Sequence, residues 1–148
     1  MKKNLILCPV DYSSSTEPAI RLAADLARAR KSKIVLLHVI DPNEHAISTV
    51  ESQNNRFQER LRDHYLVENN VEFQHVTRHG NPADTIIKFA KKQSTDIIVM
   101  GTHGRTGLAR VVVGSVAQKV MALASCPVVT VKLPTLSKVK LLRQSVRH

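Results

Sequence analysis

The chain has 148 residues and a formal net charge of +10, and 43% of its residues are hydrophobic while only 3% are aromatic. This length fits one domain with an aliphatic core. No apolar run approaches the roughly 20 residues of a membrane-spanning helix. No signal peptide is recognisable, so we expect a cytoplasmic protein. Its two cysteines are too few for a disulfide framework. The basic excess favours polyanionic partners, namely nucleotides, nucleic acid or acidic membranes, without choosing among them.

Strands and helices are predicted to alternate along the first half of the chain. Residues 4–10 form a continuous apolar run, the pattern of a strand buried on both faces. A helix is predicted over residues 16–30, after three serines that can cap it. Residues 34–40 predict a second buried strand. Residues 50–69 are mostly polar and predict a helix, with apolar residues at helical spacing at Phe57, Leu61, Tyr65 and Leu66.

The second half continues the alternation. Asn81 is expected to cap a helix with Pro82 at its first position. The predicted elements are a strand over 72–78, a helix over 82–93, a strand over 96–100, a loop over 101–114, a helix over 115–124 and a strand over 128–132. This order predicts an α/β fold, a single doubly wound, five-stranded parallel sheet with helices on both faces, Rossmann-like. Residues 1–133 are expected to form the domain. Residues 134–148 form a basic tail, expected to be flexible, with a short basic amphipathic helix as the alternative.

The strongest local signal is a cluster of glycines. Four of the five glycines lie between residues 101 and 114, directly after a predicted strand and before a predicted helix. Backbone N–H groups exposed in such a loop, followed by a helix N-terminus, make a cradle for anions. Arg105 and Arg110 add positive charge nearby. In open parallel sheets ligands bind beyond the carboxyl ends of the strands, so we expect a phosphate-bearing ligand there.

Two common phosphate-binding motifs are excluded. A P-loop needs a Gly-Lys pair, and the chain has none. The dinucleotide-binding fingerprint needs glycines in the turn after the first strand, and residues 11–15 contain none.

The motif Gly101-x2-Gly104-x9-Gly114-Ser115 resembles the ATP-binding signature of the universal stress protein family. Four other landmarks match that family in order: Asp11, His38-Val39-Ile40, Gly80-x-Pro82 and Cys126-Pro127-Val128-Val129. The resemblance covers about residues 3 to 132. It implies a fold similar to that of the adenine nucleotide alpha hydrolases and places the chain in the ATP-binding branch of the family.

The resemblance also implies a site. The nucleotide-binding residues expected from it are Pro9, Val10, Asp11, Val39, Met100, Gly101, His103, Gly104, Gly114, Ser115 and Val116. The backbone at Val39 is expected to recognise the adenine edge, and Asp11 to approach the ribose or a bound metal ion. The glycines are expected to wrap the phosphates. The implied cofactor is ATP, with or without Mg²⁺, for which Asp11 is the best candidate ligand.

Structural roles compete with these assignments. Asp11 can simply organise the turn after a strand. Ser115 begins a Ser-Val-Ala-Gln segment that fits a capping box. His103 has no identifiable catalytic partner, so a backbone or stacking contact is favoured over a general base. His38 is expected to be a satisfied polar residue at the edge of the sheet.

The last strand, residues 128–132, is predicted to be an apolar sheet edge, and open edges invite pairing. The resemblance implies a homodimer through Val128–Lys132. The expected function is that of a nucleotide-responsive regulatory or stress-response module. A slow ATPase or nucleotide-processing enzyme is one alternative. A basic adaptor for nucleic acid or other polyanions is another, although nucleic acid is disfavoured because no aromatic stacking platform exists.

Overall fold

The structure is a computed structural model that describes residues 2–11, 13, 15–44, 48–102 and 113–132. Five strands and four helices alternate within this part of the chain, as predicted. They are β1 (Leu5–Pro9), α1 (Thr16–Arg30), β2 (Lys33–Ile40), α2 (Thr49–Glu68), β3 (Phe73–His79), α3 (Pro82–Lys92), β4 (Ile97–Gly101), α4 (Ser115–Leu123) and β5 (Val128–Val131). None of the helices described is long and apolar enough to cross a bilayer.

The strands form one parallel sheet in the order β3-β2-β1-β4-β5. The chain winds outward from β1 through β2 to β3, then returns to place β4 and β5 on the other side of β1. The strand order therefore reverses between β1 and β4, where doubly wound sheets bind ligands. The predicted α/β class is confirmed, and β5 is an edge strand as expected.

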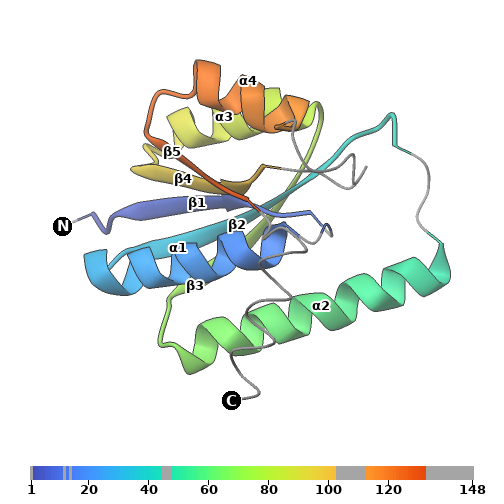
Figure 1. Cartoon of the computed structure of the whole chain (residues 1–148), viewed down its shortest axis with the longest axis horizontal. Coiled ribbons are helices and arrows are strands. Elements are labelled where there is room, and N and C mark those ends of the chain that lie inside the picture. Colours follow the sequence, from blue (N-terminus) through green and yellow to red (C-terminus); the bar gives the residue numbers. More distant parts are fainter. Residues whose placement is uncertain (1, 12, 14, 45–47, 103–112, 133–148) are drawn as a thin grey trace, which may run out of the picture.

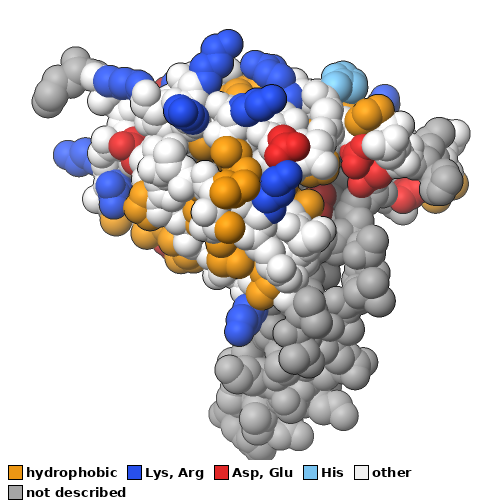
Figure 2. Space-filling model, turned by 90° about the horizontal axis from the view of Figure 1, so that it is seen from above, with side chains coloured by type: hydrophobic (Ala, Val, Ile, Leu, Met, Phe, Trp, Pro, Cys, Tyr) orange, Lys and Arg blue, Asp and Glu red, His pale blue; other side chains and the backbone are white. Residues whose placement is uncertain are grey.

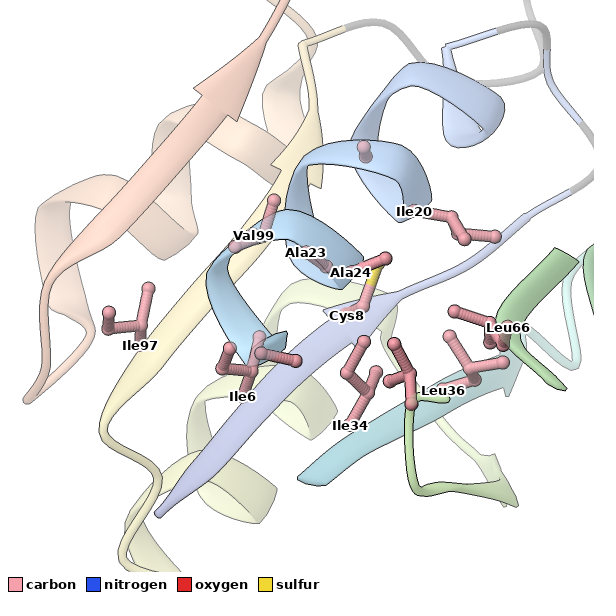
Figure 3. Packing of buried hydrophobic residues seen from close by; sticks show 13 residues of the cluster. Ile6, Cys8, Ile20, Ala23, Ala24, Ile34, Leu36, Leu66, Ile97 and Val99 are labelled. Atoms are coloured by element: carbon pink, nitrogen blue, oxygen red, sulfur yellow. The ribbon is translucent and has the colours of Figure 1, made fainter. Parts of the chain in front are cut away.

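Successive strand residues point to opposite faces, which gives the sheet two cores. Ile6 and Cys8 belong to the core under α1 and α2, while Leu5 and Leu7 belong to the core under α3 and α4. All four side chains are at most 4% exposed. Figure 1 shows α3 and α4 above the sheet and α1 and α2 below it. Figure 3 shows how alanines of α1 let that helix approach the strand residues closely.

Helix α2 departs from the apolar face that its sequence suggested. Phe57 and Leu61 are 60% and 53% exposed. Leu66 is buried and the partly buried Tyr65 packs on the same core, as predicted. The other inward positions are taken by Asn55 and Arg62, which share a helix face with Leu66. Helical spacing alone therefore did not tell which side of this polar helix meets the sheet. In Figure 1 the N-terminal end of α2 reaches past the sheet.

The helix starts differ in how they are capped. Asn81 caps α3 by accepting a 3.1 Å hydrogen bond from the Asp84 N–H, with Pro82 at the first position, as predicted. Ser48 caps α2 in the same way. Helix α4 begins at Ser115 as predicted, but the capping box considered as an alternative role for Ser115 is not formed, because Gly114 is the N-cap. Neither α4 nor α1 has a side-chain cap.

Cys8 gives a testable pH dependence. Its side chain is fully buried, and burial raises the pKa of the thiol from 9.0 to about 12. An unfolded chain releases this proton near pH 9, whereas the folded chain keeps it, so the stabilising contribution is complete below pH 9 and is lost as the pH rises towards 12. We expect the free energy of unfolding to fall by about 1.4 kcal/mol per pH unit from this group above pH 9. A Cys8→Ala variant should lack this increment in urea titrations at pH 8 to 10.5, and equal slopes in both proteins would contradict the assignment.

Candidate functional site

A cavity of about 260 Å³ opens at the carboxyl edge of the sheet. It is lined by the ends of β1, β2 and β4 and by the first residues of α1, α3 and α4. Nine of the residues that the sequence suggested line it together: Pro9, Val10, Asp11, Val39, Met100, Gly101, Gly114, Ser115 and Val116. His103 and Gly104, the other two, lie outside the described residues. Segments far apart in the sequence thus meet at the point where the strand order reverses.

The cavity also has a lining that sequence reasoning missed. The additional residues are Ser15, Thr16, Leu37, Glu44, Pro82, Ile86, Thr102 and Ala117, together with His38, which had been assigned a structural role. Four of them, Ser15, Thr16, Pro82 and Ala117, sit in the first turn of a helix or just before it. Because every helix here follows a strand, helix starts gather at the carboxyl edge, and this signal was available in the predicted element order.

The β2 segment offers the cavity a paired donor and acceptor. The last ladder bond between β1 and β2 runs from the Val10 N–H to the Leu37 carbonyl at 2.9 Å, so the backbone groups of Leu37 face β1. The backbone N–H and C=O of Val39, two residues further along β2, face the same side of the strand as those of Leu37. On the other side, Ile40 faces β3 and accepts from the Gly80 N–H at 3.0 Å. Val10 and Asp11, the described residues that follow β1, make no bond to the Val39 backbone, so its N–H and C=O are available on the side of β1, next to the cavity that Val39 lines.

Asp11 organises the turn between β1 and α1. Its Oδ1 accepts hydrogen bonds from the backbone N–H of Ser13 at 2.9 Å, from the Ser13 hydroxyl, and from the Thr16 hydroxyl at 2.7 Å. Thr16 is buried, so this contact fixes the carboxylate against the start of α1. The turn role considered for Asp11 is therefore present. The same residue also lines the cavity, and its Oδ2 accepts none of these bonds.

Gly101 is required by the packing of α1 on β4. A Cβ built on Gly101 would lie 2.8 Å from the Ser15 Cβ and 3.0 Å from the Ser15 carbonyl oxygen. Ser15 is 1% exposed and has no room to withdraw. The missing side chain thus brings the uncapped start of α1 against the end of β4. Close helix–strand packing, rather than space for a ligand, explains this glycine.

Thr102 holds the two ends of the glycine-rich segment together. Its carbonyl accepts a 2.6 Å hydrogen bond from the Gly114 N–H, and its own N–H donates to the Val131 carbonyl of β5 at 3.0 Å. The Gly114 N–H is therefore occupied. The next three N–H groups, of Ser115, Val116 and Ala117, belong to the first turn of α4, which has no internal partner for them. With no side-chain cap present, these N–H groups remain directed at the cavity end of the helix.

The sequence model that describes the universal stress protein family matches residues 4–132 of the chain. The chain belongs to this family. Universal stress protein MJ0531 of Methanocaldococcus jannaschii is 32% identical to it over 139 residues, which cover 87% of this chain and 82% of that protein.

Solved universal stress proteins share the fold. Universal stress protein UspA from Lactobacillus plantarum has a TM-score of 0.75 at 24% identity, covering 88% of this chain and 99% of its own. The universal stress protein from Archaeoglobus fulgidus, solved in complex with dAMP, has a TM-score of 0.64 at 21% identity, over 87% and 97%. A family protein from Arabidopsis thaliana, solved with AMP bound, has a TM-score of 0.64 at 22% identity, over 89% and 93%.

The charges around the cavity of this universal stress protein are carried by few side chains. Among the described lining residues, Asp11 and Glu44 are acidic and none is Lys or Arg. Within the described parts of the chain, no cluster of three or more His, Cys, Asp or Glu side chains is arranged to hold a metal ion. An anion bound in this cavity would therefore be contacted by backbone N–H groups, by helix N-termini and by any cation that binds together with it.

Proposed function

We propose that this universal stress protein binds an adenine nucleotide, ATP above all, in the cavity at the carboxyl edge, and that occupancy of the cavity is its regulatory signal. The observation that carries the proposal is the combination of the outward-facing backbone pair of Val39 with two uncapped helix starts around one cavity. The family proteins solved with dAMP and with AMP support an adenine ligand.

The proposed pose follows from the chemistry of the lining. Adenine presents an acceptor, N1, beside a donor, its N6 amino group, and the Val39 N–H and C=O match this pair. Apolar neighbours such as Val10 and Met100 provide surfaces for the base and sugar. The phosphates then reach the start of α4, where the N–H groups of Ser115 and Val116 and the positive end of the helix dipole favour negative charge.

Magnesium fits the same arrangement. Mg²⁺ keeps several waters and is held by one or two carboxylates together with the phosphates of a nucleotide. Asp11 offers one carboxylate oxygen, Oδ2, while its Oδ1 is held by Ser13 and Thr16. We therefore expect chelation of Mg²⁺ to weaken ATP binding more than AMP binding, because only ATP carries phosphates that share the ion with Asp11.

The proposal is tested by identifying the nucleotide that travels with the protein. Protein purified quickly from cells should release adenine nucleotides on acid precipitation, detected by mass spectrometry in near-stoichiometric amount, and nucleotide-free protein should bind Mg·ATP in calorimetric titration. Absence of released nucleotide together with no binding heat at millimolar Mg·ATP would overturn the proposal.

Base selectivity gives a sharper prediction. Guanine presents O6 as an acceptor and N1–H as a donor, so both groups oppose the Val39 pair. Two mismatched buried polar contacts cost about 1–3 kcal/mol each. We expect GTP and ITP to bind at least about 30-fold more weakly than ATP in competition titrations, because both carry O6 and N1–H. Equal affinity for ATP and ITP would show that Val39 does not recognise the base.

We also propose a homodimer through Val128–Lys132. The bonds from Ile98 to Pro127 and from Thr102 to Val131 show that residues 127 and 131 face β4, so Val128 and Thr130 direct their N–H groups outward from the sheet edge. A Thr130→Pro variant removes one outward N–H without removing a bond to β4. We expect it to shift a sedimentation-equilibrium dimer to monomer at unchanged fold. A monomeric parent chain would contradict the proposal.

We assign this function to the cytoplasm, where free thiols such as Cys8 and Cys126 stay reduced.

A further inference from the structure

The net charge of the described chain is concentrated on one layer. The described residues contain 16 Lys and Arg and 12 Asp and Glu, a net charge of +4. Helices α3 and α4, with the β3 residue that lies over α3, carry five of the 16 basic side chains and one of the 12 acidic ones, Asp84. The five are Arg78, Lys88, Lys91, Lys92 and Lys119. The rest of the described chain holds 11 of each sign, so this layer, the α3/α4 face, accounts for all of the excess.

The basic side chains of this face are exposed and mostly lack acidic partners. Lys119 pairs with Asp84 at 2.7 Å, which joins α4 to α3. Arg78 lies over the ring of Phe89 at 5.6 Å, which positions its charge on α3. No ion pair is found for Lys88, Lys91 or Lys92 among the described residues, whereas Lys3, Arg21 and Arg28 elsewhere each have one. Lys2 adds a further cation beside the end of α3, since its Nζ is 3.5 Å from the Gln93 carbonyl.

Exposed aliphatic side chains accompany the lysines. Met121 and Leu123 of α4 are 42% and 59% exposed. Figure 2 shows this side of the molecule, with blue basic side chains around an orange apolar strip. Helices α3 and α4, which carry these side chains, lie next to each other in one layer above the sheet (Figure 1).

We infer that the α3/α4 face is a docking surface for an anionic lipid bilayer. Each Lys or Arg near an acidic leaflet adds favourable electrostatic free energy, and aliphatic side chains on the same face enter the interfacial region. The surface lies beside the cavity rather than over it. Lys88, Lys91 and Lys92 are two to six residues beyond Ile86, the last α3 residue that lines the cavity, which is about 3–9 Å along the helix. Their side chains are exposed, whereas Ile86 is buried. The inference rests on the exposed charges and aliphatic side chains of this face and is independent of the proposed nucleotide.

A bilayer fits this face better than nucleic acid does. The phosphates of nucleic acid would be attracted by the lysines, but they offer no apolar surface on which Met121 and Leu123 could be buried. The aromatic ring of the face, Phe89, is half-buried under Arg78 and unavailable for stacking on a base.

The test is sedimentation of the full chain with vesicles of phosphatidylcholine alone or with 30% phosphatidylserine, at 0.1 M salt. We expect binding to the anionic vesicles only. The variant Lys88→Glu/Lys91→Glu/Lys92→Glu should lose more than roughly 100-fold in partitioning, since the loss of each basic residue alone costs roughly fivefold and each glutamate adds repulsion. The matched control, Arg30→Glu/Arg56→Glu/Arg60→Glu, makes the same change in net charge on the opposite side of the sheet and should lose less than about threefold. Leu123→Ser should weaken binding several-fold at constant charge.

Three results would overturn the inference. One is no binding of the parent chain to anionic vesicles. The second is an equal loss in both triple variants, which would trace binding to net charge. The third is a loss of duplex RNA binding in the α3 variant without a loss of vesicle binding, which would make the face a nucleic-acid surface. Thermal unfolding and ATP titration of each variant check that the fold and the cavity are intact, so a failure here is distinguishable from a failure of the proposed nucleotide site.

Discussion

Replacement of Gly114 by valine is expected to weaken ATP binding about 100-fold and to change stability by only about 1 kcal/mol. Gly114 lines the cavity at the entry to α4, next to the N–H groups proposed for the phosphates. Its φ of −58° and ψ of 153° are open to any residue, so a side chain brings no backbone strain. Added bulk stands between the phosphates and the helix start, and a 100-fold loss corresponds to about 2.7 kcal/mol. Calorimetric titration with Mg·ATP measures it.

Gly114→Ala provides the graded control for this variant. Its single methyl group should cause a smaller loss of ATP affinity than valine does. The loss of stability should be similar for both variants, because alanine and valine are both poor N-cap residues. Thermal unfolding of both variants separates loss of the site from loss of the fold. A valine variant that binds Mg·ATP as tightly as the parent would mean that the phosphates do not approach the start of α4.

Replacement of Gly101 by alanine is expected to act mainly on stability, by about 2 kcal/mol. The new methyl group would lie 2.8 Å from the Ser15 Cβ and 3.0 Å from its carbonyl oxygen, so α1 must move away from β4. Overpacking of this kind in a closed core typically costs 1–3 kcal/mol. For a domain of this size the melting temperature should fall by about 4–8 °C. ATP affinity should fall as well, because Ser15 and Thr16 line the cavity.

A second substitution tests whether the Ser15 contact is the cause. Ser15→Gly removes the Cβ and hydroxyl that oppose the new methyl group and leaves only the carbonyl oxygen. In a double-mutant cycle, the loss caused by Gly101→Ala should be at least halved in the Ser15→Gly background. Additive effects of the two substitutions, or a Gly101→Ala protein that melts like the parent, would contradict the packing explanation.

The fold could be predicted from the sequence because local patterns and global topology agree. Continuous apolar runs such as residues 5–9 and 97–100 are dictated by burial on both faces of a parallel sheet. Asn81-Pro82 marked the start of α3 through capping chemistry that needs no tertiary information. Alternation of the two element types then leaves few arrangements, and the doubly wound one was found.

Prediction from the sequence failed where tertiary contacts decide between local arrangements that the sequence allows equally well, such as the buried side of a helix or its N-cap. In α2 both sides carry some apolar residues, and contact with the sheet selects Leu66 over Phe57. At α4 the hydrogen bond from the Gly114 N–H to Thr102 fixes the helix entry, so the serine that fitted a capping box became the first helical residue instead. Neither partner is local in the chain, so neither outcome was visible beforehand.

The candidate site was predicted in part for the same reasons. The glycine cluster and Asp11 were visible as sequence signals, and they do line one cavity. The role of Gly101 was not visible, because only the structure brings Ser15 against it. The direction of the Val39 backbone groups depends on where β1 leaves the sheet, which follows from strand register and not from residue identity.

The most direct measurement is a crystal structure of the protein grown with millimolar Mg·ATP. The adenine should lie within hydrogen-bond distance of the Val39 N–H and C=O, with phosphate oxygens on the N–H groups of Ser115 and Val116 and the ion beside Asp11. A nucleotide bound elsewhere, or a cavity closed by the protein's own side chains at that concentration, would contradict the account.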